Sequence, residues 1–200
     1  MSAEKKERMR QIRDEVLALS SSPLYGYRTE NKYFPVIGEG SHDAKIMFVG
    51  EAPGRNEAKT GRPFCGAAGK ILDELLASAD IPREEVYITN IVKDRPPENR
   101  DPLPEEIASY GPFLDRQIEI IEPKVIATLG RYSMVYIMQK FGLENRLDTI
   151  GKLHGQAFTA AASYGDITIL PLYHPASAIY NRELMGTLRE DFQKLAFYRD

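Results

Sequence analysis

The chain has 200 residues, of which 42% are hydrophobic and 28% charged, a composition typical of one compact globular domain. No apolar run approaches the roughly 18 to 20 residues that a membrane helix requires, so a membrane-spanning protein is excluded. Because 26 basic residues stand against 29 acidic ones, giving a net charge of -3, any contact with a polyanion requires a local basic patch.

The chain opens with a helical apolar spacing over residues 4–20, formed by Met9, Ile12, Val16 and Leu19. Short apolar segments rich in β-branched residues predict buried strands at residues 44–49, 85–91, 124–129 and 167–172. Helical patterns follow them at residues 69–80, 104–123, 130–141 and 183–197, and Pro112 is expected to kink or restart the second of these.

This alternation of strands and helices predicts an α/β fold with three layers, α/β/α, around a central, mainly parallel four-stranded sheet. We expect residues 1–200 to form a single domain, on which the N-terminal helix of residues 1–22 packs. The first residues show no apolar signal segment, so a cytoplasmic, nucleoid-associated location is expected.

Polar residues stand where three of the predicted strands end. Glu51, Asn90 and His174 occupy equivalent places, and ligands of open parallel sheets bind beyond the carboxyl ends of the strands. Taken singly, they have ordinary explanations: a helix cap, a turn residue and a histidine bound to a backbone carbonyl. Their convergence on one rim favours a functional pocket.

The loop after the first strand contains five glycines between residues 50 and 69. It does not match a phosphate-binding Walker A loop, because Gly69-Lys70 is followed by Ile71 rather than Ser or Thr. We expect instead a stiff pocket wall, in which glycines let the backbone approach a ligand closely and prolines limit its movement.

Four motifs at these strand ends resemble the family-4 uracil-DNA glycosylases over roughly residues 20–197. In chain order they are Gly50-Glu51-Ala52-Pro53-Gly54; Gly61-Arg62-Pro63-Phe64 with Gly66 and Gly69; Thr89-Asn90-Ile91-Val92-Lys93 with Arg95-Pro96-Pro97 and Asn99-Arg100; and His174-Pro175-Ala176. Both their order and their spacing are similar to those of the family. The resemblance implies an enzyme that flips uracil out of DNA and cleaves its glycosidic bond.

The resemblance also implies roles for four side chains. Phe64 would stack on the flipped uracil, and the amide of Asn90 would donate to O4 and accept from N3–H. His174 would hydrogen-bond O2 of the departing base, while Glu51 would position water and face the cationic sugar. Other uracil-binding candidates are Gly50, Ala52, Glu57 and Asn99.

DNA-binding candidates are Lys93, Arg95, Arg100 and Ser177. Acidic neighbours cancel the charge of the three cations within the same segment, so a solvated loop is an equally good explanation. After the His-Pro-Ala motif the family usually continues with an aliphatic stretch and then Arg-Asn-Pro. This chain instead reads Ser177-Ala178-Ile179-Tyr180-Asn181-Arg182, so the arginine of that Arg-Asn-Pro motif is missing.

Family-4 enzymes typically hold a four-iron, four-sulfur cluster on four cysteines. The matching positions here hold Leu19, Ser22, Asp94 and Tyr110, and Cys65 is the only cysteine of the chain. A single thiol also excludes an internal disulfide and a four-thiolate zinc site. We therefore expect no metal and no cofactor, with hydrophobic contact between Leu19 and Tyr110, and a polar contact of Ser22 with Asp94, in place of the cluster.

The sequence thus predicts a monofunctional hydrolase that removes uracil from single- or double-stranded DNA with water as nucleophile and leaves an abasic site. We expect a monomer whose partner is DNA and not a membrane. Two alternatives stay open: an enzyme of the same superfamily acting on hypoxanthine or xanthine, and a non-catalytic module that binds damaged DNA.

Overall fold

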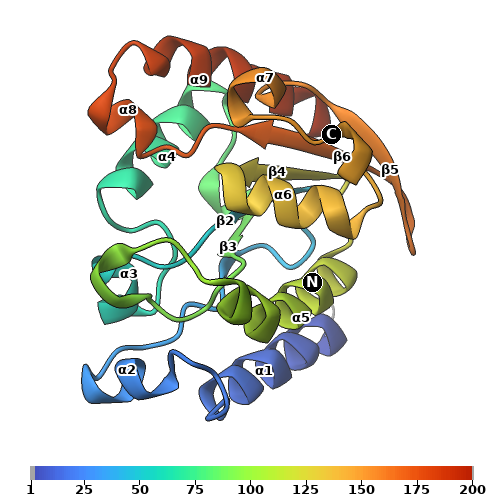
Figure 1. Ribbon diagram of the computed structural model, residues 1–200. Coiled ribbons are helices and arrows are strands. Elements are labelled where there is room, and N and C mark those ends of the chain that lie inside the picture. Colours follow the sequence, from blue (N-terminus) through green and yellow to red (C-terminus); the bar gives the residue numbers. More distant parts are fainter. Residues whose placement is uncertain (1–2, 200) are drawn as a thin grey trace.

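The computed structural model describes residues 3–199, and its centre is a six-stranded sheet in the order β1-β3-β2-β4-β6-β5 (Figure 1). The strands are β1 (Glu39–Gly40), β2 (Ile46–Gly50), β3 (Tyr87–Asn90), β4 (Val125–Leu129), β5 (Phe158–Ala162) and β6 (Gly165–Leu172). The four inner strands pair in parallel, and the edge strands β1 and β5 pair antiparallel to their neighbours. The mainly parallel α/β sheet is confirmed.

The predicted number of four strands is wrong, because the sheet also contains two edge strands whose sequences lack a continuous apolar run. β1 has only two residues, neither of them buried. β5 alternates between buried and exposed positions over a sequence dominated by alanine. Edge strands with one exposed face need no continuous apolar run, so their sequences carry a weaker signal than those of the inner strands.

Two apolar layers lie on opposite faces of the sheet. Along β2, Met47 and Val49 belong to one buried cluster, and Ile46 and Phe48 to the other. This follows from the two-residue period of a strand, and it explains why every residue of β2 is apolar apart from the terminal glycine. Helices on both faces complete the predicted three layers.

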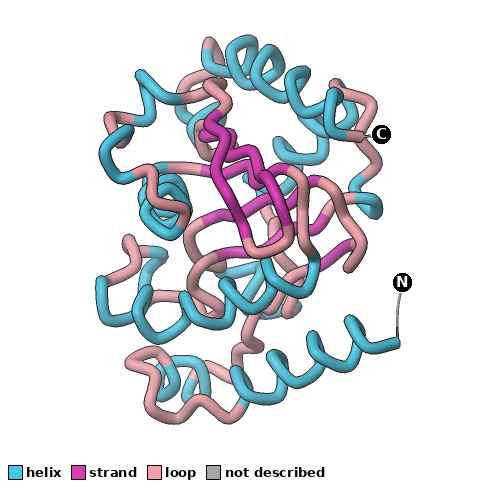
Figure 2. The backbone as a smooth tube through the Cα atoms, turned by 90° about the vertical axis from the view of Figure 1, so that its right-hand side faces the viewer, coloured by secondary structure: helices cyan, strands magenta, loops and turns pink. Residues whose placement is uncertain are grey.

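Figures 1 and 2 show how the helices surround the sheet. The α-helices are α1 (Ala3–Leu17), α2 (Tyr25–Glu30), α3 (Arg55–Thr60), α4 (Ala67–Ser78), α5 (Pro104–Ile121), α6 (Arg131–Lys140), α7 (Ile150–Leu153), α8 (Ser177–Tyr180) and α9 (Leu184–Gln193). Single 3₁₀ turns occur at Arg83–Glu85, Pro97–Asn99, Glu144–Arg146 and Lys194–Tyr198. α4 and α9 pack on one face of the sheet, and α5 and α6 on the other.

Of the expected kink or restart at Pro112, the restart is wrong, because α5 continues as one helix through this residue. Tyr110, Leu114, Ile118 and other side chains of its inner face are buried, and this burial offsets the backbone bond that a proline removes. α1 packs along α5 (Figure 1). No helix within residues 3–199 combines the length and the apolar character needed to cross a membrane.

The strand order creates a crevice beside β2. β3 and β4 flank β2 on opposite sides, so the connections that leave these strands diverge at their carboxyl ends. The register pairs Gly50 at the end of β2 with Asn90 at the end of β3. At the end of β6, His174 follows two residues after Leu172, which pairs with Leu129 of β4. The fold therefore brings the predicted site residues to one edge of the sheet.

Candidate active site

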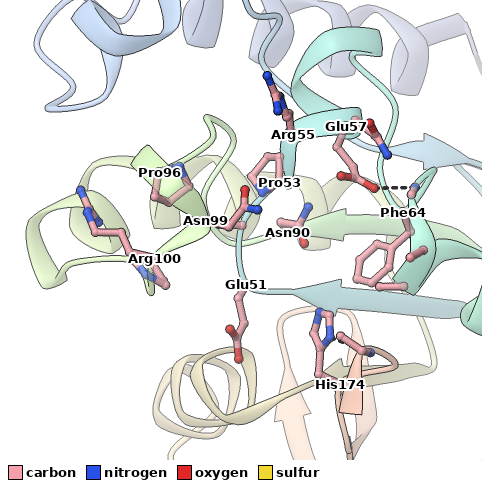
Figure 3. A pocket seen from close by; sticks show the side chains of 18 of the residues that line it. Glu51, Pro53, Arg55, Glu57, Phe64, Asn90, Pro96, Asn99, Arg100 and His174 are labelled. Atoms are coloured by element: carbon pink, nitrogen blue, oxygen red, sulfur yellow. Dashed lines mark hydrogen bonds between the residues drawn. The ribbon is translucent and has the colours of Figure 1, made fainter. Parts of the chain in front are cut away.

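A pocket of about 460 Å³ lies at the carboxyl ends of the parallel strands (Figure 3). The loop from Glu51 into α3, the start of α4 and the end of β3 form part of its wall. The loop of residues 96–102 and the segment after β6 close the rest. Its volume is within the range of pockets that hold a small organic group.

His174 is held in one tautomer. The backbone N–H of Ala176 donates to its Nδ1 at 3.1 Å, so in the neutral ring the proton is on Nε2. Burial lowers the pKa of His174 to about 4, although the negative charge of Glu57 opposes this shift. At neutral pH the pocket therefore contains an uncharged imidazole with a single N–H donor.

Glu51 lies beside the first turn of α6. Its Oε1 accepts a hydrogen bond from the backbone N–H of Tyr132 at 3.3 Å. Burial raises the pKa of this carboxyl; the Tyr132 N–H opposes the shift and the charge of Asp101 adds to it. Gly130 has a φ of 100°, which residues with a side chain rarely adopt, and a Cβ atom there would also come within 2.5 Å of Glu51 Oε1. These two constraints explain the glycine before α6. The hydrogen bond from Tyr132 shows that Glu51 binds α6 and not α3, the helix that follows it in the sequence.

Asn90 is 2% exposed, and its amide lies at the centre of the pocket wall between Glu51 and Phe64 (Figure 3). A Cβ atom at Gly50 would overlap both Asn90 Oδ1 and the Phe64 ring. Gly50 does not line the pocket, and its contribution is the space that it leaves for these two side chains. Ala52, in contrast, is part of the wall.

Phe64 adopts a left-handed backbone conformation, with φ of 47°, which is unusual for an aromatic residue. Its ring lies 5.7 Å from the His174 ring, centre to centre, with 31° between the planes. The ring is 6% exposed and faces the pocket (Figure 3). It can therefore serve as one side of a slot for a flat ligand.

Two charged residues fix the backbone around Phe64. Arg83 Nη2 donates to the carbonyl oxygens of Pro63 and Phe64, at 2.8 and 3.3 Å. Glu57 Oε1 accepts from the N–H groups of Cys65 and Gly66, at 3.0 and 2.8 Å. The carboxylate of Glu57 is thus engaged with the loop, although the residue lines the pocket. Sequence reasoning missed Arg83, because only the fold brings it to this loop.

Asn99 also reaches the pocket, but its side-chain oxygen is occupied. Arg95 Nε donates to Asn99 Oδ1 at 2.7 Å, and Arg95 Nη1 donates to the hydroxyls of Tyr27 and Tyr33. Arg95 is 9% exposed and does not line the pocket. Its guanidinium is engaged within the protein, which contradicts the expected phosphate contact.

The expected contact of Lys93 with phosphate is wrong. Lys93 is fully buried, and its ammonium donates to Thr89 Oγ1, to the Asn90 carbonyl oxygen and to Gln117 Oε1, at 2.8, 2.7 and 2.5 Å. Burial lowers the pKa of Lys93 well below its usual value. Its partner Gln117 is on α5, so the sequence around Lys93 gave no sign of this inward position.

The remaining predicted DNA contacts lie at or near the rim. Arg100 lines the pocket and makes two hydrogen bonds to the Glu106 carboxylate, at 3.0 and 2.6 Å. Ser177 begins α8, and its N–H donates to the His174 carbonyl oxygen at 2.9 Å. Arg55, which sequence reasoning missed, is exposed at the rim (Figure 3).

Comparison with known proteins agrees with this arrangement. Residues 37–198 match the uracil DNA glycosylase superfamily. The Type-4 uracil-DNA glycosylase of Sulfurisphaera tokodaii is 47% identical over 188 residues, which cover 94% of this chain and 83% of the relative. The Type-4 enzyme of Thermotoga maritima is 42% identical over 192 residues, covering 95% and 94%. The Type-5 uracil-DNA glycosylase of Pyrobaculum aerophilum is 30% identical over 179 residues, covering 81% and 75%. The chain therefore belongs to the uracil-DNA glycosylase superfamily.

Proposed function

We propose that this chain removes uracil from DNA by hydrolysing the N-glycosidic bond, with water as nucleophile and an abasic site as product. The observation that carries the proposal is the position of the Asn90 amide, which faces the same pocket as the Phe64 ring and the neutral His174. The Type-4 relatives, named uracil-DNA glycosylases, support the same reaction.

Base recognition would rest on Asn90 and Phe64. A carboxamide offers one acceptor and two donor hydrogens, so Asn90 can accept from uracil N3–H and donate to O4. Cytosine presents the opposite pattern at these two atoms. Phe64 would stack on the flipped base and replace part of the stacking lost from the duplex.

Bond cleavage would rest on His174 and Glu51. As the bond between C1′ and N1 breaks, its electron pair moves onto the base, and the Nε2–H of His174 can donate to O2, where negative charge accumulates. Glu51 as a carboxylate would stabilise the cationic sugar and orient the water that bonds to C1′. The water proton would pass to Glu51.

DNA contact would come from the rim. Arg55 and Arg100 are the arginines that line the pocket, and we assign phosphate contacts to them. Tyr180, at the end of α8, also lines the pocket and is 90% exposed. An exposed aromatic ring beside a base pocket is suited to filling the space that a flipped nucleotide leaves in the duplex.

A single-turnover assay tests the proposed function. Oligonucleotides carrying uracil, hypoxanthine or xanthine are incubated with excess enzyme, and abasic sites are read as alkali-labile breaks. We expect cleavage at uracil. Cleavage only at a purine base would favour the other enzymatic alternative, and tight binding of uracil DNA without cleavage would favour a non-catalytic binding module.

A further inference from the structure

The residues of this chain do not fit the iron–sulfur cluster that its resemblance to family-4 enzymes implies. Leu19, Ser22, Asp94 and Tyr110 occupy the four cysteine positions, and none of them supplies a thiolate. Cys65 lies elsewhere, before α4, where its sulfur is 3.3 Å from Thr60 Oγ1. Within residues 3–199, no group of three or more His, Cys, Asp or Glu side chains is placed to hold a metal ion.

Three of the four positions are instead joined by hydrogen bonds. Tyr110 Oη donates to Asp94 Oδ2 at 2.5 Å, and Ser22 Oγ lies 2.7 Å from Tyr110 Oη. Because the phenol proton is directed to the carboxylate, Ser22 is the donor to Tyr110. Ser22 Oγ in turn accepts from the N–H of Leu24 at 3.1 Å. The polar contact expected between Ser22 and Asp94 thus runs through the hydroxyl of Tyr110.

Arg28 completes this network. Its Nη1 donates to both carboxylate oxygens of Asp94, at 3.3 and 3.1 Å, so the buried negative charge has a buried positive partner. The same guanidinium donates to the carbonyl oxygens of Val16 and Leu17, at 3.0 and 2.7 Å. These are the last two residues of α1, whose carbonyls have no partner within the helix.

The network is buried and joins segments that are far apart in the sequence. Exposed fractions are 6% for Ser22, 5% for Arg28, 1% for Asp94 and 0% for Tyr110. Ser22 lies in the turn after α1 and Arg28 in α2, whereas Asp94 lies in the loop after β3 and Tyr110 in α5. The residue after Asp94 is Arg95, which binds Asn99 in the pocket wall.

We propose that Ser22, Arg28, Asp94 and Tyr110 form a metal-free cross-link that takes the place of the iron–sulfur cluster in this chain. The cross-link holds the wall of residues 95–102 against α1, α2 and α5. An iron–sulfur cluster connects its segments through bonds from four cysteines to iron. Here hydrogen bonds connect these segments, and they join the Asp94 carboxylate to the Tyr110 phenol and the Arg28 guanidinium, and the phenol to the Ser22 hydroxyl. Each member satisfies its neighbour, as buried polar networks require.

The first test is composition. Protein purified without oxygen from an iron-replete culture is analysed for iron and for visible absorption. We expect less than stoichiometric iron and no broad absorption band in the visible range. Stoichiometric iron with such a band would overturn the proposal. This measurement does not involve uracil, so it can fail or succeed independently of the proposed enzymatic function.

The second test is a double-mutant cycle on the ion pair. Arg28→Met and Asp94→Leu should each lower the melting temperature by about 10 °C, because each leaves one buried charge without its partner. The double variant should melt no lower than the less stable single variant. Additive losses would show that the two side chains act independently and would contradict the cross-link.

A milder substitution covers the case in which the single variants do not fold. Tyr110→Phe keeps the ring and removes only the hydroxyl, so we expect a lower melting temperature and faster amide exchange in residues 94–102. Tyr136→Phe is the matched control. It also removes one phenol hydroxyl, which donates from Tyr136 on α6 to the carboxylate of Asp115 on α5 at 3.0 Å. Equal exchange of residues 94–102 in both variants would overturn the proposal.

Discussion

At the scale of single residues, Glu51 and His174 differ in how burial shifts their protonation. Burial raises the pKa of Glu51 above its ordinary value and lowers the pKa of His174 to about 4. If Glu51 must be ionised to act, the single-turnover rate should rise with pH through a midpoint above the usual glutamate range. His174 should add no transition between pH 5 and 8, because it is already neutral there.

Glu51→Gln checks this assignment. The variant should lose the acid limb of the profile and react more slowly by roughly ten- to a thousandfold, a loss common for one preorganised group. Its melting temperature at neutral pH should not fall, because a raised folded-state pKa means that the ionised carboxylate is less stable in the fold than in the unfolded chain. An unchanged profile would remove Glu51 from the reaction.

Asn90→Asp addresses base recognition. A carboxylate has no hydrogen to donate to uracil O4, and a protonated carboxyl group places its hydrogen differently, so uracil excision should weaken. Activity on cytosine is the expected gain. Rates on matched uracil and cytosine oligonucleotides measure both effects. If the uracil rate is unchanged, Asn90 does not read the base.

At the scale of elements, the short loop between α3 and α4 depends on side chains outside itself. Arg83→Met should release the carbonyls of Pro63 and Phe64, leave the left-handed backbone of Phe64 less fixed and lower the rate roughly ten- to a hundredfold. Arg62→Met is the matched control, because the Arg62 guanidinium is exposed and donates to the Glu39 carboxylate rather than to the carbonyls beside Phe64. Equal rates in the two variants would contradict a role for Arg83 in placing the ring.

The helix α8 offers a separate test of duplex contact. Tyr180→Ala should lower excision from double-stranded DNA about tenfold, the rate equivalent of losing one stacking contact, and change excision from single strands less. Phe197→Ala removes another exposed aromatic ring, 87% exposed and outside the pocket, and serves as control. The same loss on both kinds of DNA would assign Tyr180 to the chemistry rather than to the duplex.

The sequence predicted those elements whose burial is nearly complete. The inner strands and the residues at their ends, Glu51, Asn90 and His174, follow from apolar runs and from the rule that parallel strands end at one edge. The inward position of Lys93 and the contact of Arg83 with the Phe64 loop did not follow. Both depend on hydrogen bonds to residues that only the tertiary fold brings near, and no local pattern encodes them.

At the scale of the whole molecule, two apolar clusters share one sheet, since alternate residues of β2 enter each. We therefore propose that the protein is one domain, and we also expect it to be a monomer. Unfolding in urea should be a single transition, coincident by circular dichroism and by tyrosine fluorescence, because the chain contains no tryptophan. Sedimentation should give the mass of one chain, 22.6 kDa. Two separated transitions would contradict the single domain.

The lone thiol gives this chain an experimental advantage over relatives with cluster cysteines. Cys65 is partly exposed and directly follows the ring that is proposed to stack on the base. A maleimide fluorophore would attach at this one position without any prior substitution, and no other cysteine would compete for it. Since Cys65 adjoins Phe64 in the chain, we expect the emission of the dye to change when a nucleotide enters the pocket. Base entry and bond cleavage could thereby be timed separately in the unmodified sequence.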